Sequence, residues 1–171
     1  MWRQLLITGC IWLAVACSPV TITGHADQQA DFNSYKTFGF APNLINKLPK
    51  YPEYDNPQIR KLIRDAIANE LTARGYTLDQ RQPDLLVQYD ILIIERIDPR
   101  VDSAMIYKPW VDTRIDSFNY TEGLLVVRLI DRQHSRLVWQ GSLSGILNRK
   151  PRQFENRVVK YIGKLFETFQ S

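Results

Sequence analysis

Residues 118–146 read FNYTEGLLVVRLIDRQHSRLVWQGSLSGI and decide the fold of this chain. The first part, residues 118–131, is rich in branched apolar side chains that alternate between two faces, which predicts a long β-strand. Residues 131–136 are polar and form a turn, and residues 137–146 return as a second strand. The two strands therefore make a β-hairpin.

The residues before this hairpin predict a helix between two further strands. The helix begins at Asn56-Pro57, because Asn caps a helix well and Pro suits its first turn. Apolar residues follow at intervals of three and four until Gly75, which tolerates the left-handed backbone that ends many helices. A short strand over residues 37–40 precedes the helix, and a strand over residues 85–94 follows it.

A second helix is expected over residues 153–169, where apolar residues again recur at helical spacing. We expect an irregular segment over residues 95–116. The order β-α-β-β-β-α predicts an α+β two-layer sandwich, with a mixed or antiparallel sheet of four to five strands and both helices on one face. The chain has 171 residues and a net charge of +4, which indicates one domain and gives no reason to expect a nucleic-acid partner.

The N-terminal residues MWRQLLITGCIWLAVAC resemble a bacterial lipoprotein signal. One positive charge is followed by an apolar run of about 12 residues, too short to span a bilayer, that ends in small residues before Cys17. Cys10 fits the same pattern with a much shorter apolar core, so we favour Cys17 as the lipidated residue. An ordinary secretory signal and an uncut membrane anchor are the alternatives.

This interpretation divides the chain into three parts. Residues 1–16 are the signal peptide, residues 17–30 are the lipidated cysteine and a flexible tether, and residues 31–171 are a single α+β domain. The lipid joins the protein to a membrane. Ser18 after the cysteine is typical of sorting to the periplasmic side of the bacterial outer membrane, so we favour this location over the inner membrane. Because Cys10 leaves with the signal, a disulfide in the mature chain is not expected.

Several short motifs, in this order, resemble a family of bacterial envelope lipoproteins named domain of unknown function 4136. The motifs are Asp31-Phe32, Tyr35-Lys36-Thr37-Phe38, Arg74-Gly75-Tyr76, Pro83-Asp84-Leu85-Leu86-Val87, Glu122-Gly123, Val126-Val127, Leu129-Ile130-Asp131 and Leu137-Val138-Trp139-Gln140-Gly141. Leu124 and Arg128 depart from the family pattern, where threonine and aspartate are common. The resemblance implies a lipid-anchored protein with a small α+β domain, and it implies no activity and no catalytic residues.

Residues with catalytic potential are few, and we expect no enzyme activity, metal or cofactor. His25 lies in the expected tether and His134 in a polar turn, so two isolated histidines do not make a metal site. Ser142 and Ser144 lie between glycines inside a strand, without the nucleophile elbow of serine hydrolases. Two carboxylate pairs, Glu95 with Asp98 and Asp112 with Asp116, leave a hydrolase as a remote alternative.

Two groups of residues are candidates for binding. Aromatic and basic side chains in the irregular segment suit a recognition loop for a partner: Tyr107, Lys108, Trp110 and Arg114. A basic cluster around the last helix suits an anionic surface: Arg149, Lys150, Arg152, Arg157, Lys160 and Lys164. A loop folded back on the sheet and a solvated helix face are the respective alternatives.

The sequence therefore predicts a lipid-anchored, periplasm-facing module without catalytic activity, whose partner is an envelope protein or a cell-wall polymer. The alternative function is to bind or carry an apolar, lipid-like ligand, which requires an apolar pocket between the helices and the sheet.

Overall fold

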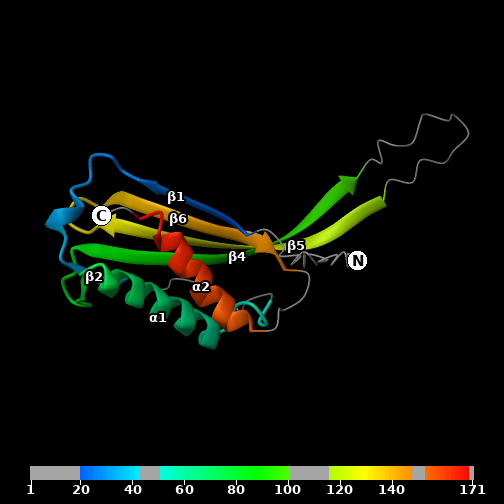
Figure 1. The fold of residues 1–171 in the computed structure, drawn as a ribbon, viewed down its shortest axis with the longest axis horizontal. Coiled ribbons are helices and arrows are strands. Elements are labelled where there is room, and N and C mark those ends of the chain that lie inside the picture. The colour runs from blue at the N-terminus through cyan, green and yellow to red at the C-terminus, as the bar shows by residue number, and fades with distance from the viewer. Residues whose placement is uncertain (1–19, 43–50, 101–115, 148–152, 170–171) are drawn as a thin grey trace, which may run out of the picture.

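The computed structural model describes residues 20–42, 51–100, 116–147 and 153–169. Two helices cover one face of a single sheet, whose longest strands run the length of the molecule (Figure 1). In chain order the elements are β1 (Thr21–Ala26), the 3₁₀ turn η1 (Phe32–Ser34), β2 (Thr37–Phe40), α1 (Pro57–Ala73), β3 (Thr77–Leu78), β4 (Leu85–Arg100), β5 (Asp116–Asp131), β6 (Arg136–Ile146) and α2 (Phe154–Phe166).

The sheet is mixed and has the strand order β1-β6-β5-β4-β2-β3. The short strand β2 runs parallel to both β3 and β4, while the other neighbouring strands are antiparallel. The predicted α+β class, the two helices and the central hairpin are confirmed. The predicted number of four to five strands is too low: the described residues form six, because β1 and β3 were not expected.

The segment expected to be a flexible tether is in part a strand. Residues Thr21–Ala26 form β1, which pairs antiparallel with β6 from Thr21 opposite Ser144 to Ala26 opposite Trp139. Most side chains of β1 are exposed, so its sequence shows little of the apolar alternation that reveals a half-buried strand. The ordered domain consequently includes residues that we assigned to the tether.

Strands β4 and β5 also extend into the segment expected to be irregular. They pair continuously from Leu85 opposite Asp131 to Arg100 opposite Asp116. On the other side of β5, the pairing with β6 ends where Glu122 lies opposite Ile146. Residues 96–100 and 116–120 therefore form a two-stranded ribbon, named here the arm, which projects from the body of the molecule (Figure 1).

The predicted caps of the first helix are confirmed. Asn56 accepts a hydrogen bond from the backbone N–H of Ile59 at 2.9 Å, and Pro57 occupies the first turn. Gly75 follows the helix with a φ of +92°, a conformation that other residues adopt at a cost. These signals are local, which explains why the sequence locates the helix within about two residues.

The core is centred on Trp139, whose side chain is fully buried between the sheet and α2. Its indole lies over Gly141 on the same strand, because a Cβ atom at Gly141 would lie 2.5 Å from Cη2 of Trp139. Phe166 and Phe169 contact the same indole, with ring centroids 5.1 and 5.4 Å away. Trp139 is thus a core aromatic that packs over a residue without a side chain.

Two glycines of β6 give a matched test of this packing. Gly141→Ala forces a Cβ into Trp139 and Leu165, whereas Gly145→Ala brings its Cβ to 3.4 Å from Cγ2 of Val20. We expect Gly141→Ala to lower the free energy of unfolding by about 1–3 kcal/mol, the usual cost of overpacking a filled core. Gly145→Ala should change it by less than about 1 kcal/mol. Urea denaturation measures both, and equal losses would contradict the packing described.

Candidate functional site

The most closely connected polar side chains lie at the end of the sheet where β5 turns into β6. Asp131 is 4% exposed and accepts three hydrogen bonds, from the hydroxyl of Tyr35 at 2.9 Å, from the backbone N–H of His134 at 3.0 Å and from Nδ1 of His134 at 2.7 Å. Burial raises the pKa of Asp131, but the hydrogen bonds from His134 and Tyr35 outweigh it and lower the pKa to about 2. Asp131 is therefore held as a carboxylate.

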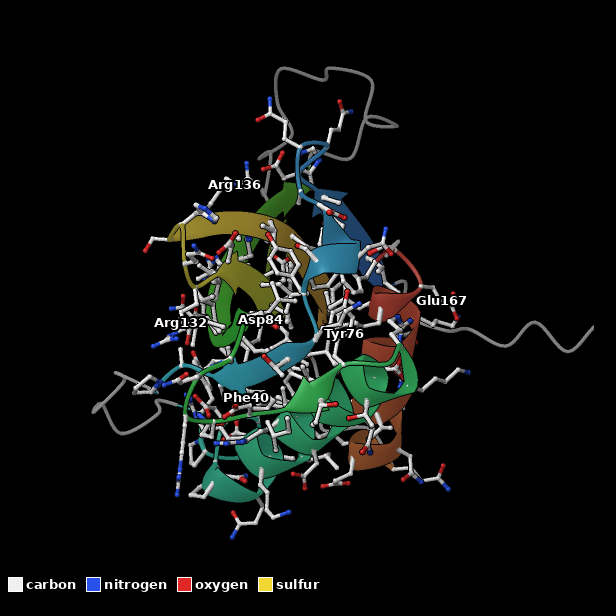
Figure 2. The ribbon with its side chains drawn as sticks, turned by 90° about the vertical axis from the view of Figure 1, so that its left-hand side faces the viewer. Phe40, Tyr76, Asp84, Arg132, Arg136 and Glu167 are labelled. Carbon is white, nitrogen blue, oxygen red and sulfur yellow. The ribbon has the colours of Figure 1, made fainter. Side chains whose placement is uncertain are left out.

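Asp84, at the start of β4, ties a second segment to the same end of the sheet (Figure 2). One oxygen of its carboxylate accepts hydrogen bonds from the backbone N–H groups of Lys36 and Thr37 and from the Thr37 hydroxyl, at 2.8–2.9 Å. The backbone hydrogen bond of Lys36 is the largest influence on the pKa of Asp84, which is lowered. Asp84 and Asp131 together fasten the chain before β2 to the strands β4 and β5.

Asp84 and Asp131, together with the groups that donate hydrogen bonds to them, are named here the clamp, because they hold separate segments of the chain together. The Asp131–His134 pair has the donor and acceptor of a catalytic dyad, but its acceptor oxygens are engaged in holding Tyr35 and the turn. The serines considered as nucleophiles lie elsewhere, in β6, where Oγ of Ser142 is 2.7 Å from Oγ1 of Thr23. Sequence reasoning treated residues 131–136 as a plain polar turn and missed the clamp, whose one local signal is Asp131 three residues before His134.

The other candidate catalytic residues are scattered. Glu95 and Asp98 lie in strand β4 and not in an irregular loop, and Glu95 accepts a hydrogen bond from the hydroxyl of Tyr51. Asp116 begins β5, and Asp112 lies outside the described residues. His25 is exposed on β1. Within residues 20–42, 51–100, 116–147 and 153–169, no group of three or more His, Cys, Asp or Glu side chains is placed to hold a metal.

The predicted recognition residues belong to the connection at the end of the arm. Tyr107, Lys108, Trp110 and Arg114 lie outside the described residues, between the last residue of β4 and the first of β5. At the base of the arm, Nε of Arg96 is 2.8 Å from Oε2 of Glu122 across the two strands.

The basic cluster is described only in part. Arg149, Lys150 and Arg152 lie outside the described residues. Lys160 and Lys164 are exposed on α2, and the spacing of three and four residues from Arg157 places all three on one side of the helix. The guanidinium of the half-buried Arg157 lies 5.9 Å from the centre of the Tyr161 ring.

The sheet face opposite the helices has two features that the sequence did not reveal. Arg128 is 2.5 Å from Oδ2 of Asp90 and donates to Gln140 at 3.1 Å, so it links three strands. The same face carries two large apolar side chains with more than two fifths of their surface exposed, namely Leu92 (43%) and Leu137 (44%).

An apolar cavity of about 160 Å³ lies between the helices and the sheet, at the end away from the clamp. Its walls come from the N-terminal halves of α1 and α2, and its floor from β4, β5 and β6. Val20, the first residue that the structure describes, also lines it. The alternative function predicted an apolar pocket in this place, although the sequence named no residue for it.

Comparison with known proteins shows the family of the chain. Residues 23–169 match the family described as domain of unknown function (DUF4136), and the chain belongs to this family. The match begins inside β1, in agreement with a domain that includes this strand. No curated protein matches the chain. Among the described helices, none is long and apolar enough to cross a bilayer.

Solved structures with a similar fold have low sequence identity. A PDZ domain protein from Parabacteroides distasonis is 17% identical with a TM-score of 0.55, over 89% of this chain and 35% of that one. The chain thus spans about a third of that protein. Two structures of the PelC dodecamer from Paraburkholderia phytofirmans are 14% and 13% identical, with TM-scores of 0.51 and 0.52, over 90% of this chain and 98–99% of theirs. At these identities the likeness shows the fold.

The clamp predicts how stability depends on pH. Because the pKa of Asp131 is about 2 in the folded protein and about 3.9 in an unfolded chain, its contribution is present above pH 4 and is lost as the pH falls towards 2. We expect Asp131→Asn to cost about 2 kcal/mol at pH 7 and to flatten the stability profile between pH 4 and 2. Urea denaturation across this range measures both effects.

Asp65→Asn is the control for this variant, because Asp65 forms an exposed ion pair with Lys61 on α1. It should leave the profile between pH 4 and 2 nearly unchanged. An Asp131→Asn protein with the same acid slope as the unmodified protein would show that Asp131 is not the group responsible.

Proposed function

We propose that this member of the DUF4136 family is a lipid-anchored protein on the periplasmic side of the bacterial outer membrane, and that its domain binds an envelope protein without catalysing a reaction. The proposed anchor rests on the sequence, in which a charged start and a short apolar run precede small residues and Cys17. Several acyl chains on one residue give durable attachment where one chain is marginal.

The arm is the observation that carries the proposed binding role. It extends over five residue pairs, from Arg96 opposite Tyr120 to Arg100 opposite Asp116, which is about 16 Å of strand. Along this length the described part of the chain supplies no third strand. An isolated two-stranded ribbon is marginally stable in water, so a surface that packs against it would stabilise it.

The chemistry expected at the end of the arm suits a protein partner. Tyr107 and Trp110 offer rigid apolar area, and Lys108 and Arg114 offer positive charge, which are residue types that often dominate protein interfaces. PelC, which shares the fold, forms dodecamers, and this supports protein–protein contact as a use of such a domain. The exposed Lys160 and Lys164 on α2 add a positive face that would favour an anionic membrane or polymer beside the domain.

The clamp supports a role without catalysis. Its two carboxylates, Asp84 and Asp131, are used as acceptors that join segments of the fold. Their pKa values are lowered, whereas a general acid or base at neutral pH requires a carboxyl pKa that is raised.

Binding of an apolar ligand is the second candidate function, and the cavity between the helices and the sheet is the specific observation in its favour. The two functions are compatible, because the cavity and the arm occupy different parts of the molecule.

Replacement of Cys17 tests the anchor. Cys17→Ser removes the sulfur that the lipid requires, so the protein should lose its acylation and leave the outer-membrane fraction. Cys10→Ser is the matched control and should stay with the membrane, because Cys10 belongs to the part of the signal that is removed. An unchanged distribution of the Cys17→Ser protein would contradict the proposed anchor.

Photo-crosslinking from the arm tests the binding role. A photoreactive amino acid at Arg96 should capture one dominant envelope protein in intact cells, whereas the same group at Lys61, which is exposed on α1, should not. The captured protein is then identified by mass spectrometry. Identical, diffuse adducts from both positions would contradict a partner at the arm, and cell-wall adducts would replace the protein partner by a polymer.

A further inference from the structure

The core between the helices and the sheet is filled near the clamp and leaves an apolar cavity at the other end. Near the clamp, Trp139 and Phe166 are fully buried and close the space between α2 and the sheet. At the other end, Ile91, Leu125 and Val158 face the cavity and stay half-buried. Apolar side chains on the helix-covered side of a sheet are normally sealed from water, so this end presents an unfilled apolar site.

Gly145 leaves space at this end, whereas a Cβ atom at Gly123 would lie 2.6 Å from Cδ1 of Leu147. Gly123 and Gly145 lie directly opposite each other on β5 and β6, and both line the cavity. A Cβ atom at Gly145 would meet one neighbour within 4 Å among the described residues, Cγ2 of Val20 at 3.4 Å. Gly141, four residues earlier on the same strand, is instead covered by Trp139. The site over Gly145 thus has room for a group that the described residues do not supply.

The lining selects an alkyl chain. Its surface is mostly aliphatic, and two of the polar groups at its edge have partners: the Tyr54 hydroxyl donates to the carbonyl of Leu147 at 3.4 Å, and the Arg157 guanidinium lies 5.9 Å from the centre of the Tyr161 ring. A ligand with buried polar groups would leave those groups without hydrogen bonds, whereas an alkyl chain has none to satisfy. Apolar cavities of about 150 Å³ take up molecules of the size of benzene, so this cavity of about 160 Å³ accommodates part of one acyl chain.

We propose that the cavity holds one acyl chain of the lipid carried by Cys17. The inference rests on the proposed lipidation of that residue. Val20 lines the cavity, and Cys17 stands three residues before it, a reach of about 10 Å in an extended chain. The attachment point of the lipid is therefore within a few residues of the cavity wall.

The chain's own lipid suits the site better than a free lipid does. A cavity that accommodates part of an acyl chain offers limited contact, and a free ligand held by so few atoms binds weakly. A tethered ligand acts at an effective concentration of about millimolar or above when the linker is short, which makes a weak site occupied. A seated chain also holds the domain close to the bilayer surface.

The test uses the full-length lipoprotein in outer membranes, from cells that incorporate a palmitate analogue carrying a diazirine. After illumination, adducts between the lipid on Cys17 and the same chain are mapped by mass spectrometry. We expect them on cavity residues such as Ile63, Ile91 and Val158. Adducts with bilayer lipids alone, on a protein whose Cys17 is acylated, would overturn the inference and leave the anchor intact. A mature N-terminus without acylation would overturn both.

A matched pair of variants ties the adducts to the cavity. Gly145→Leu places a side chain in the cavity and should lower the cavity adducts by about tenfold or more, since the tethered chain loses its site. Ser142→Leu adds the same side chain to the same strand outside the cavity lining, and should leave the adducts unchanged. Equal adducts in both variants would overturn the inference.

Two further measurements complete the test. Thermal unfolding of the Cys17→Ser forms of both variants shows that each one folds; if Gly145→Leu does not fold, the smaller Gly145→Val replaces it, with the same expected loss of adducts. A diazirine phospholipid added to the membranes distinguishes the source of the chain. Cavity adducts from this phospholipid, without any from the lipid on Cys17, would also overturn the inference.

Discussion

The contact of the Trp139 indole with Gly141 determines how the two layers of this protein meet. The absence of a side chain at Gly141 lets the largest side chain of the core lie flat on β6, under α2. Phe166 and Phe169 then close on the indole, and Phe169 contacts Phe32 with ring centroids 5.2 Å apart. One aromatic cluster thus joins the sheet, the last helix and the segment before β2. Aromatic pairs of this kind add to the stability that burial alone supplies.

The filled core at one end leaves the other end free for different uses. The clamp of Asp84 and Asp131 fastens the closed end, where the lowered pKa values show carboxylates engaged in structure. At the open end lie the cavity, the beginning of the described chain at Val20 and the base of the arm. This division suits a domain that is attached to a membrane and binds a partner. The cavity and the arm use side chains that the packing near the clamp does not require.

The elements that the sequence predicts well are those whose signals are local. Asn56 and Gly75 mark the ends of α1, and the apolar alternation around the turn at His134 marks the central hairpin. Strand β1 was missed because an exposed edge strand needs no apolar periodicity. The outer part of β4 was missed because Pro99 and mixed charges are typical of loops, although an edge strand tolerates a proline.

The candidate sites depend on contacts between distant residues, which no local pattern encodes. The clamp joins Tyr35 to Asp131 across 96 residues, and the cavity is lined by residues of both helices and of β4, β5 and β6. The role of Arg128 also appears only in the fold, since this residue bridges Asp90 and Gln140 on the neighbouring strands. The lipid and the recognition residues at the end of the arm stay predictions from sequence.

Hydrogen–deuterium exchange of the arm in native outer membranes tests the central claim of a membrane-anchored binding module most directly. Backbone amides of a ribbon without a third strand open easily, and a bound partner suppresses that opening. We predict that residues 96–100 and 116–120 exchange at least about tenfold more slowly in native membranes than in the purified lipoprotein in detergent, while α1 exchanges equally in both. Equal, rapid exchange of the arm in both preparations would contradict the account.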